Sequence, residues 1–460
     1  MSQTDFSTLN LNTALLDNLK TLEYLEMTPI QAQSLPPILD AKDVIAQGKT
    51  GSGKTAAFAL GMLQNLDVKN LSVQSLVLCP TRELADQVAT EVRRLGRGIP
   101  NIKVITLCGG MPSAAQVASL EYGAHIVVGT PGRIEDHLSK AKLNLAHLNT
   151  FVLDEADRML DMGFQTSLEA IINELPAKRQ TLLFSATFSS QIQSIAKRIM
   201  NDPVSVEAVS AHDNSTIQQH LYKIDNEIDR LTAVRLLLMK HRPESAVIFC
   251  KTKKETSDIS DELRRYGFDS LSLNGDLEQR DRDQVLVRFA NKSISILVAT
   301  DVAARGLDIE ALDLVINYQM AHDTEVHVHR VGRTGRAGSK GFACTLYAEN
   351  EHHKLAQLEE YLGQRISPEK LPGFEVLEQE IYRAAMVTLR IDAGKKQKIR
   401  PGDILGALTA EGGIAGNQVG KIQVANSWSY VAVNRGVAKA ALKKLSEGKL
   451  KGRSYRARQI

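Results

Sequence analysis

KDVIAQGKTGSGKTAAFALGMLQ, residues 42–64, runs from a short apolar segment through a glycine-rich turn into a stretch typical of a helix. Its centre, residues 48–55, fits the pattern G-x-x-x-x-G-K-[ST], which forms a phosphate-binding loop when it lies between a strand and a helix. Glycines there let backbone N–H groups close around phosphate oxygens. The alternative is a chance match in a glycine-containing turn, and the flanking strand and helix argue against it.

The residues of this loop have separate expected roles. Lys54 should reach the β- and γ-phosphate oxygens, and the Thr55 hydroxyl can ligate Mg²⁺. The remaining positions of the cradle are Gly48, Thr50, Gly51, Ser52 and Gly53. The pattern thus predicts ATP and Mg²⁺ as cofactors.

A cluster of acids follows about a hundred residues later, where the apolar run TFVLDEAD ends. We assign Asp154 to Mg²⁺ and Glu155 to the attacking water as general base, since acids at this place can do both. Taken alone, this tetrapeptide is an ordinary acidic start of a helix. Its position after a strand and a phosphate loop makes catalysis the preferred interpretation.

Around these motifs, short β-branched runs alternate with amphipathic stretches, which predicts α/β domains with parallel sheets. The alternation stops after Pro203, in the polar segment VEAVSAHDNST, and restarts with SAVIFC. A final segment shows four strand-like and two helix-like stretches, as in a small α+β domain. We expect domains at 1–206, 219–365 and 384–460, joined by linkers at 207–218 and 366–383.

Composition indicates a soluble globular protein, with 43% hydrophobic and 24% charged residues. The N-terminus has no signal-peptide pattern and no stretch is apolar enough to span a membrane, so we expect a cytoplasmic protein. The four widely spaced cysteines should be buried thiols. Charge is uneven: residues 384–460 carry 15 Lys and Arg against four acids. Such a basic segment suggests a polyanionic partner.

The first 362 residues resemble the DEAD-box RNA helicase family. The motifs that carry this resemblance, in order, are Phe6 with Thr28-Pro29-Ile30-Gln31, the phosphate loop, Pro80–Ala85, Gly109-Gly110, Thr130-Pro131-Gly132-Arg133, the DEAD box, Ser185-Ala186-Thr187, Val247–Thr252, Gln279 with Arg282, Thr300–Asp308 and His329–Arg336. Two departures are His327, where the family usually has Tyr, and the LEYLEM context before Thr28.

The resemblance implies two RecA-like domains that divide one ATPase site. Phe6 and Gln31 would read adenine, and Asp308 would meet the ribose. Arg333 and Arg336 would act as arginine fingers in cis. His329 would organise the catalytic water and link to Ser185 and Thr187.

It also implies RNA contacts from both domains, through small, hydroxyl and Arg residues that suit phosphate and 2′-OH groups rather than base edges. In the first domain these are Thr81, Arg82, Gly109, Gly110, Thr130, Gly132 and Arg133. In the second they are Thr252, Gly275, Gln279, Arg282, Thr300, Asp301 and Arg305.

The segment 384–460 resembles the RNA-recognition-like domain of the DbpA subgroup, through residues 394–408 and the closing KLKGRSYRARQI. Trp428 and Tyr430 stand at positions where such domains stack bases, whereas Thr388 and Val433 replace usual aromatics. The expected phosphate contacts are Lys395, Lys396, Lys398, Arg400, Lys451 and Arg453. The alternative is a solvated basic domain that raises RNA affinity in general.

The first resemblance implies an RNA-dependent ATPase and helicase that unwinds duplexes locally. The resemblance to the DbpA subgroup implies that the C-terminal domain directs it to a hairpin of 23S ribosomal RNA and to precursors of the large ribosomal subunit. No obligate protein partner is evident. The alternatives are an ATP-gated RNA clamp, a general RNA chaperone and a DNA helicase.

Overall fold

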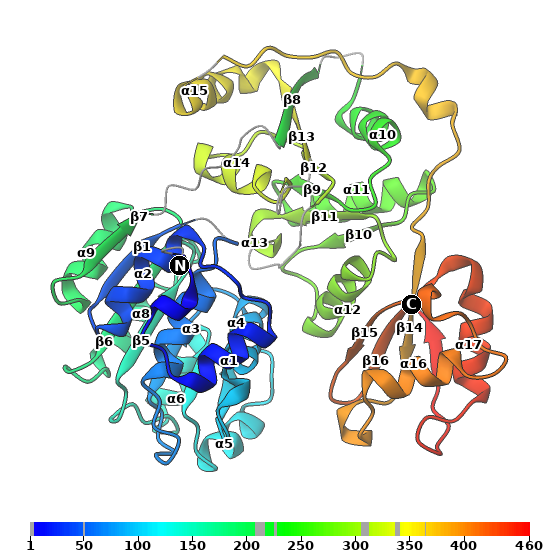
Figure 1. The fold of residues 1–460 in the computed structure, drawn as a ribbon. Coiled ribbons are helices and arrows are strands. Elements are labelled where there is room, and N and C mark those ends of the chain that lie inside the picture. Colours follow the sequence, from blue (N-terminus) through cyan, green and yellow to red (C-terminus); the bar gives the residue numbers. More distant parts are fainter. Residues whose placement is uncertain are drawn as a thin grey trace. The chain divides into compact units, whose positions relative to one another are not determined.

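The computed structural model describes residues 4–48, 51–207, 217–224, 228–304, 312–335, 341–363 and 365–460. These residues form two compact units, one ending at residue 207 and one starting at residue 217. Their helices and strands are labelled in Figure 1.

The first unit is a parallel sheet with the strand order β3-β4-β2-β5-β6-β1-β7. Its strands are β1 (Val44–Gln47), β2 (Ser75–Leu78), β3 (Val104–Leu107), β4 (Ile126–Gly129), β5 (Thr150–Asp154), β6 (Gln180–Ser185) and β7 (Val204–Glu207). The helices are α1 (Thr13–Thr21), α2 (Pro29–Leu39), α3 (Lys54–Gln64), α4 (Arg82–Leu95), α5 (Ser113–Glu121), α6 (Pro131–Ser139), α7 (Ala156–Asp161), α8 (Gln165–Asn173) and α9 (Ser190–Ile199).

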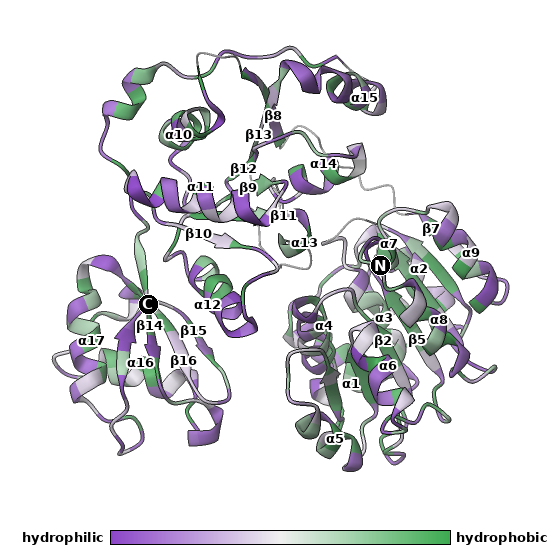
Figure 2. Cartoon of the chain, turned by 180° about the vertical axis from the view of Figure 1, so that it is seen from behind, coloured by the Kyte–Doolittle hydropathy of each residue, from purple (hydrophilic) through white to green (hydrophobic). Residues whose placement is uncertain are grey.

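This sheet is buried on both faces, as the continuous apolar runs predict for parallel strands. Along β5, Val152 lies in the core under α1–α4, whereas Phe151 and Leu153 lie in the core under α6–α9. Figure 2 shows hydrophobic residues (green) along the central strands. Because side chains alternate between the faces of a strand, one strand contributes to both cores.

The second unit begins with another parallel sheet, in the order β10-β11-β9-β12-β13-β8. Its strands are β8 (Ile217–Ile224), β9 (Ala246–Cys250), β10 (Ser270–Leu273), β11 (Ile296–Thr300), β12 (Leu314–Asn317) and β13 (Gly341–Ala348). Its helices are α10 (Arg230–His241), α11 (Lys253–Arg265), α12 (Gln279–Ala290), α13 (Asp301–Ala304), α14 (Thr324–Val331) and α15 (His352–Leu362).

Two segments of this unit differ from the sequence-based expectation. Edge strand β8 was not anticipated, because IQQHLYKI lacks the apolar run of the central strands. The segment 366–383, which we expected to be a linker, packs on the second α/β core through Leu371, Val376 and Ile381. It contains a short 3₁₀ helix, Phe374–Glu378. Its apolar residues are widely spaced, so no helix or strand period reveals their burial.

The C-terminal domain has the predicted four strands and two helices. The antiparallel sheet has the order β15-β16-β14-β17. Its strands are β14 (Met386–Ile391), β15 (Val419–Val424), β16 (Ser429–Asn434) and β17 (Ala457–Gln459), and its helices are α16 (Pro401–Thr409) and α17 (Ala438–Glu447). Leu389, Ile404 and Ala441 belong to one core between sheet and helices. Together the three sheets confirm the predicted fold class.

All four cysteines are buried and free, as predicted. Over the described residues, no helix combines the length and the apolar character needed to cross a membrane.

Candidate nucleotide site and nucleic-acid interface

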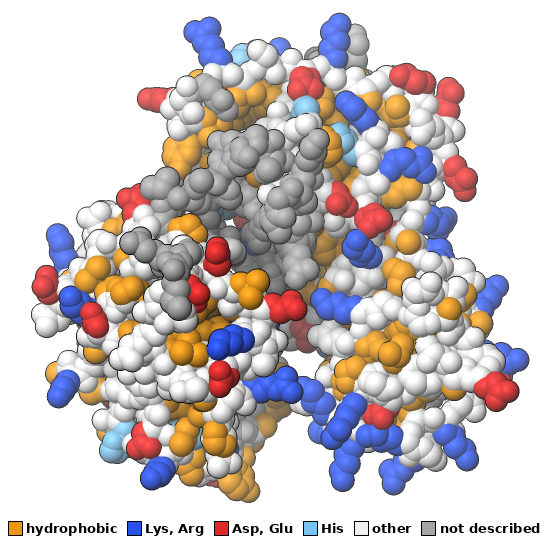
Figure 3. All heavy atoms as spheres, in the orientation of Figure 1, with side chains coloured by type: hydrophobic (Ala, Val, Ile, Leu, Met, Phe, Trp, Pro, Cys, Tyr) orange, Lys and Arg blue, Asp and Glu red, His pale blue; other side chains and the backbone are white. Residues whose placement is uncertain are grey.

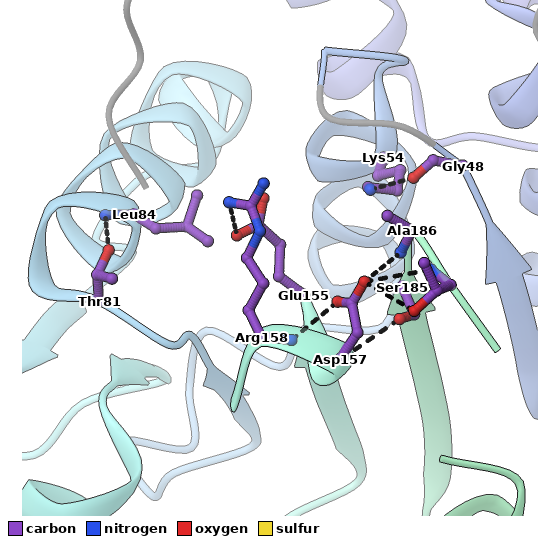
Figure 4. A network of polar contacts seen from close by, with 10 residues as sticks. Gly48, Lys54, Thr81, Leu84, Glu155, Asp157, Arg158, Ser185 and Ala186 are labelled. Carbon is purple, nitrogen blue, oxygen red and sulfur yellow. Dashed lines mark hydrogen bonds and ion pairs between the residues drawn. The ribbon is translucent and has the colours of Figure 1, made fainter. Parts of the chain in front are cut away.

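The phosphate loop leads directly into α3, which begins at Lys54. Gly53 precedes this helix with φ +95°, a left-handed conformation that favours glycine. The Lys54 side chain is buried, and its Nζ donates to the Gly48 carbonyl (Figure 4). The lysine is therefore folded over the loop. Thr50, which we predicted in the cradle, lies outside the described residues.

Helix α2 fastens this loop from one side. The Thr28 hydroxyl donates to the Ser52 carbonyl at 2.8 Å, and Gln31 Nε2 donates to the Gly53 carbonyl at 3.0 Å. Gln31 Oε1 accepts from the Thr28 backbone at 2.9 Å. The Gln31 amide, predicted to read adenine, is thus engaged with the loop itself. Phe6 is buried in the core beside Tyr24, and its predicted adenine contact stays a prediction.

The acids predicted to be catalytic stand at the end of β5 in a buried setting. Asp154 is 3% exposed. Its burial, and next the charge of Glu155, raise the Asp154 pKa to about 7. Glu155 has φ +55°, uncommon for a residue with a side chain. Its carboxylate accepts from Arg158 at 2.7 Å in a buried ion pair. Sequence reasoning missed Arg158, which follows the acids by one position.

The donors at this site fit Mg²⁺. Asp154 Oδ1 and Ser52 Oγ are buried and have no hydrogen-bond partner among the described residues. Over the same residues, no group of three or more His, Cys, Asp or Glu could hold a metal ion. A single carboxylate with a hydroxyl is a usual protein share for Mg²⁺, which keeps waters and substrate phosphates as its other ligands. Asp154 and Thr55 would hold it here.

Asp157 connects the acids to the next motif along the sheet. Its Oδ2 accepts from the backbone N–H groups of Ala186 and Thr187, both at 3.2 Å. Its own N–H donates to the Ser185 hydroxyl at 3.3 Å (Figure 4). The Ser185–Thr187 segment, predicted to couple the two domains, is therefore fixed to the DEAD box.

Strand order divides the carboxyl edge of the first sheet into two halves. The phosphate loop follows β1, the acids lie at the end of β5, and Ser185 ends β6; these three strands are neighbours. The predicted RNA residues follow three other neighbours, β2, β4 and β3. Thr81 and Thr130 are the residues preceding α4 and α6, and Gly109-Gly110 follows β3. Motifs far apart in sequence thus meet in two groups. One holds the residues predicted to bind the nucleotide, and the other holds those predicted to bind RNA.

The second sheet has a comparable arrangement. Thr252 and Gly275 follow β9 and β10, and Thr300 ends β11; these three strands are again neighbours. Gln279 and Arg282 lie in the first turns of α12, where Arg282 donates to the Ala303 carbonyl at 2.8 Å.

Asp301, predicted to contact RNA, is already paired inside this unit. Its carboxylate accepts from Arg330 at 2.6 and 2.7 Å, in an ion pair whose arginine is buried. Arg330 therefore ties the Thr300–Asp308 motif to the motif that starts at His329. Arg333 is also buried. Three residues with predicted roles, Arg305, Asp308 and Arg336, lie outside the described residues.

The basic segments of the C-terminal domain come together in the fold. Lys451 Nζ donates to the Lys398 carbonyl at 2.6 Å and contacts Asp403 at 3.1 Å. Lys395 and Lys396 are exposed. Their backbone N–H groups donate to the carbonyls of residues 425 and 426, so both lysines lie beside the turn that precedes Trp428. Figure 3 shows Lys and Arg side chains (blue) over this domain. The part-exposed Trp428 ring lies 5.1 Å from the Arg390 guanidinium carbon.

The face of this sheet that points away from α16 and α17 contacts the second α/β domain. Thr388 is fully buried and hydrogen-bonds to Ser293 and Asn291 at 2.6 and 3.2 Å. Tyr430 is 2% exposed, so in this structure it offers no ring face to a base, contrary to our expectation of stacking. Arg435 pairs with Asp269 at 2.9 Å. The second α/β domain supplies these partners, which a sequence pattern for the small domain alone does not reveal.

Comparison with known proteins agrees with this arrangement. Residues 28–195 match the family described as DEAD/DEAH box helicase, residues 227–338 the helicase conserved C-terminal domain, and residues 388–459 the DbpA RNA binding domain. A single-residue variant of Saccharomyces cerevisiae Dbp5, bound to RNA and ADP BeF3, is 31% identical, with a TM-score of 0.72, and the match covers 82% of this chain and 97% of that chain. Fold and site thus define a DEAD-box ATP-dependent RNA helicase.

Two curated relatives identify the group within this class. The ATP-dependent RNA helicase DbpA of Escherichia coli is 51% identical over 99% of this chain and 100% of its own length. The protein of the same name from Bacillus subtilis is 35% identical over 98% of both. The chain belongs to the DEAD-box RNA helicases of the DbpA type, which are RNA-dependent ATPases.

Proposed function

We propose that the C-terminal domain directs this helicase to a hairpin of 23S ribosomal RNA, where it unwinds short duplexes during assembly of the large ribosomal subunit in the cytoplasm. The observation that supports targeting is the meeting of two distant basic segments, near Lys398 and Lys451, beside the part-exposed Trp428. Such a surface suits phosphates together with one stacked base. Tyr430 is left out of this proposal because it is buried.

We also propose the division of catalytic work. When bound, Mg²⁺ supplies positive charge to the phosphate oxygens. Asp154 and Thr55 hold it, Lys54 and the loop amides hold the phosphates, and Glu155 accepts the proton of the attacking water. Arg333 and Arg336 stabilise charge on the transferring group. Intact acids and arginines favour turnover over a non-catalytic clamp, and a phosphate-release assay separates the two.

The targeting is tested by RNA-stimulated ATPase activity with a 23S hairpin RNA and an unrelated RNA of equal length. Replacing Lys395, Lys396 and Lys398 by Ala should raise the concentration of hairpin needed for half-maximal stimulation and flatten its salt dependence, by a slope of about 0.7 for each lost phosphate contact. Trp428→Ala should cost about 1–3 kcal/mol with the slope unchanged.

The matched control replaces Lys439 and Lys443, two exposed lysines of α17 in the same domain. This variant removes two positive charges, against three in the triple variant, and neither lysine belongs to the proposed surface, so its preference for the hairpin should be kept. If the control loses as much preference as the triple variant, the domain raises RNA affinity only through its net charge. DNA of equal sequence, compared with RNA, tests the choice of nucleic acid.

A further inference from the structure

Gln116 is a buried amide in α5, outside every motif used above, and it lies between two segments of the first domain that are proposed to bind RNA. It is 7% exposed. Its Nε2 donates to the carbonyl of Cys108, immediately before Gly109-Gly110, at 2.9 Å. Its Oε1 accepts from Nη1 of Arg133 at 3.0 Å. One side chain therefore bridges the loop after β3 and the first turns of α6.

The arginine has a second bond to the same loop. Arg133 Nη1 also donates to the Met111 carbonyl at 3.1 Å. The guanidinium is therefore fixed at two points, one on the loop and one on the amide that holds the loop. Because charged donors make the stronger hydrogen bonds, this pair should set the direction of the arginine.

His137 forms a further hydrogen bond to the Gln116 amide. It is fully buried, and its Nε2 lies 2.9 Å from Gln116 Oε1. Since a carbonyl oxygen only accepts, Nε2 must carry the hydrogen. The Nδ1 atom is buried and has no partner among the described residues. Burial, and next the charge of Arg133, lower the His137 pKa, so the ring is a neutral donor at pH 7.

The loop is confined on its other side as well. Gly110 has φ +70°, and a Cβ there would lie 2.1 Å from the nearest guanidinium nitrogens of Arg82. The Arg82 side chain thus lies directly against the loop. Gly109, by contrast, has open space where a Cβ would stand. The bridge of Gln116 and the contact with Arg82 together leave the loop little freedom to shift.

We infer that Gln116 and His137 are positioning residues for RNA binding, which hold the Gly109-Gly110 loop and Arg133 in one arrangement before RNA arrives. This inference rests on the proposed RNA contacts of these segments. An amide is required because the site needs a donor toward Cys108 and an acceptor toward Arg133 and His137. Preorganisation of this kind lowers the cost of ordering side chains on binding.

The test is RNA-stimulated ATPase activity of the full chain with Gln116→Met, which keeps the length of the side chain and removes its polar atoms. We expect the RNA concentration at half-maximal rate to rise roughly tenfold, the scale of one lost hydrogen bond to a charged group. The maximal rate and the KM for ATP should change less than about twofold, since the residues predicted to bind the nucleotide are untouched. Gln116→Glu keeps the acceptor for Arg133, so it should restore part of the loss.

The matched control is Gln180→Met. Gln180 is another buried glutamine of the same unit, whose Nε2 donates to the carbonyls of Ile38 and Lys42 at 2.9 and 2.7 Å. It is the first residue of β6 and so lies at the amino ends of the parallel strands, whereas the RNA motifs lie at the carboxyl ends. Its replacement should lower the melting temperature comparably and leave the RNA concentration at half-maximal rate unchanged. An equal rise in both variants would mean that Gln116 has a structural role only.

A double-mutant cycle with Arg133→Ala tests the path of the effect. If Gln116 acts through Arg133, the double variant should be less impaired than the product of the two single effects. A fully multiplicative result overturns the inference. If Arg133→Ala itself leaves RNA stimulation unchanged, the proposed RNA contact fails instead, so the two failures are distinguishable.

Discussion

Glu155 combines three features that are uncommon in one residue: a buried carboxylate, a left-handed backbone and a partner one turn along its own helix. The backbone turn aims the side chain across the end of β5, and Arg158 fixes it there. Strain of this kind persists only where the surrounding structure imposes it, and it gathers at functional sites. We therefore expect loss of the Glu155 carboxylate to affect turnover and loss of Arg158 to affect stability.

Glu155→Gln should keep the shape of the site and lose the group that accepts a proton. Turnover at saturating RNA should fall by roughly 10² or more, the scale for loss of a general base. ATP-dependent RNA binding should remain, because Asp154 and Lys54 are intact. Phosphate release and equilibrium RNA binding measure the two quantities, and hydrolysis at the wild-type rate would contradict the assignment.

Arg158→Met should act on stability first. Asp154, Glu155 and Asp157 are all buried at one strand end, and the substitution removes the cation that is paired with Glu155. Loss of one partner of a buried ion pair costs about 3–5 kcal/mol. Denaturant unfolding should show this loss, and Glu155→Gln in the same chain should recover part of it. No recovery in the double variant would mean that the arginine acts through packing alone.

At the scale of elements, motifs that end strands were predictable and connections between elements were not. The apolar runs indicated where β1 and β5 end, and therefore where the phosphate loop and the acids lie. The roles of Gln116 and His137 were not predicted, because the sequence around a polar helical residue does not show which residues of other elements it contacts. Edge strand β8 was missed because five of its eight residues are partly or fully exposed, so it has no continuous apolar run.

Gly394 shows the same dependence on a neighbouring element, and it can be tested. A Cβ there would lie 2.3 Å from the Ala425 carbonyl oxygen, in the turn before Trp428. Gly394→Ala should therefore push apart two loops of the proposed RNA surface and destabilise the domain by about 1–3 kcal/mol. Weaker hairpin binding should accompany the loss, as measured by thermal unfolding and titration with RNA.

Gly406→Ala is the matched control, because nothing lies within 4 Å of a Cβ at that position inside α16. Alanine is the better helix former, so stability should stay or rise by up to about 1 kcal/mol. Equal destabilisation by both substitutions would show that close approach of the two loops is not what Gly394 provides.

Across the whole molecule, the sequence predicted the two parallel sheets and the small four-stranded sheet, because periodicity reports which faces of a segment are buried. It could not predict that the second α/β domain covers Thr388 and Tyr430, since both partners of such a contact look like ordinary surface. His327, the departure from the usual Tyr of the family, is a similar case: only the structure shows that it is 4% exposed.

This histidine makes the stability of the whole chain depend on pH. Burial, and next the charge of Arg330, lower the His327 pKa to about 4, and Nδ1 has no hydrogen-bond partner among the described residues. The unfolded chain, with an ordinary pKa of about 6.5, takes up the proton first. The stabilisation is therefore complete above that pH and is lost as pH falls toward 4. The slope is at most about 1.4 kcal/mol per pH unit.

His327→Tyr removes this titration, so the free energy of unfolding should depend less steeply on pH between about 5.5 and 6.5, the window below the unfolded histidine pKa and above most carboxyl groups. The slope is the quantity to compare, because a larger ring changes absolute stability through packing as well. Chemical denaturation at several pH values measures it for both proteins. Equal slopes would show that His327 is already protonated in the folded chain or stays neutral in both states.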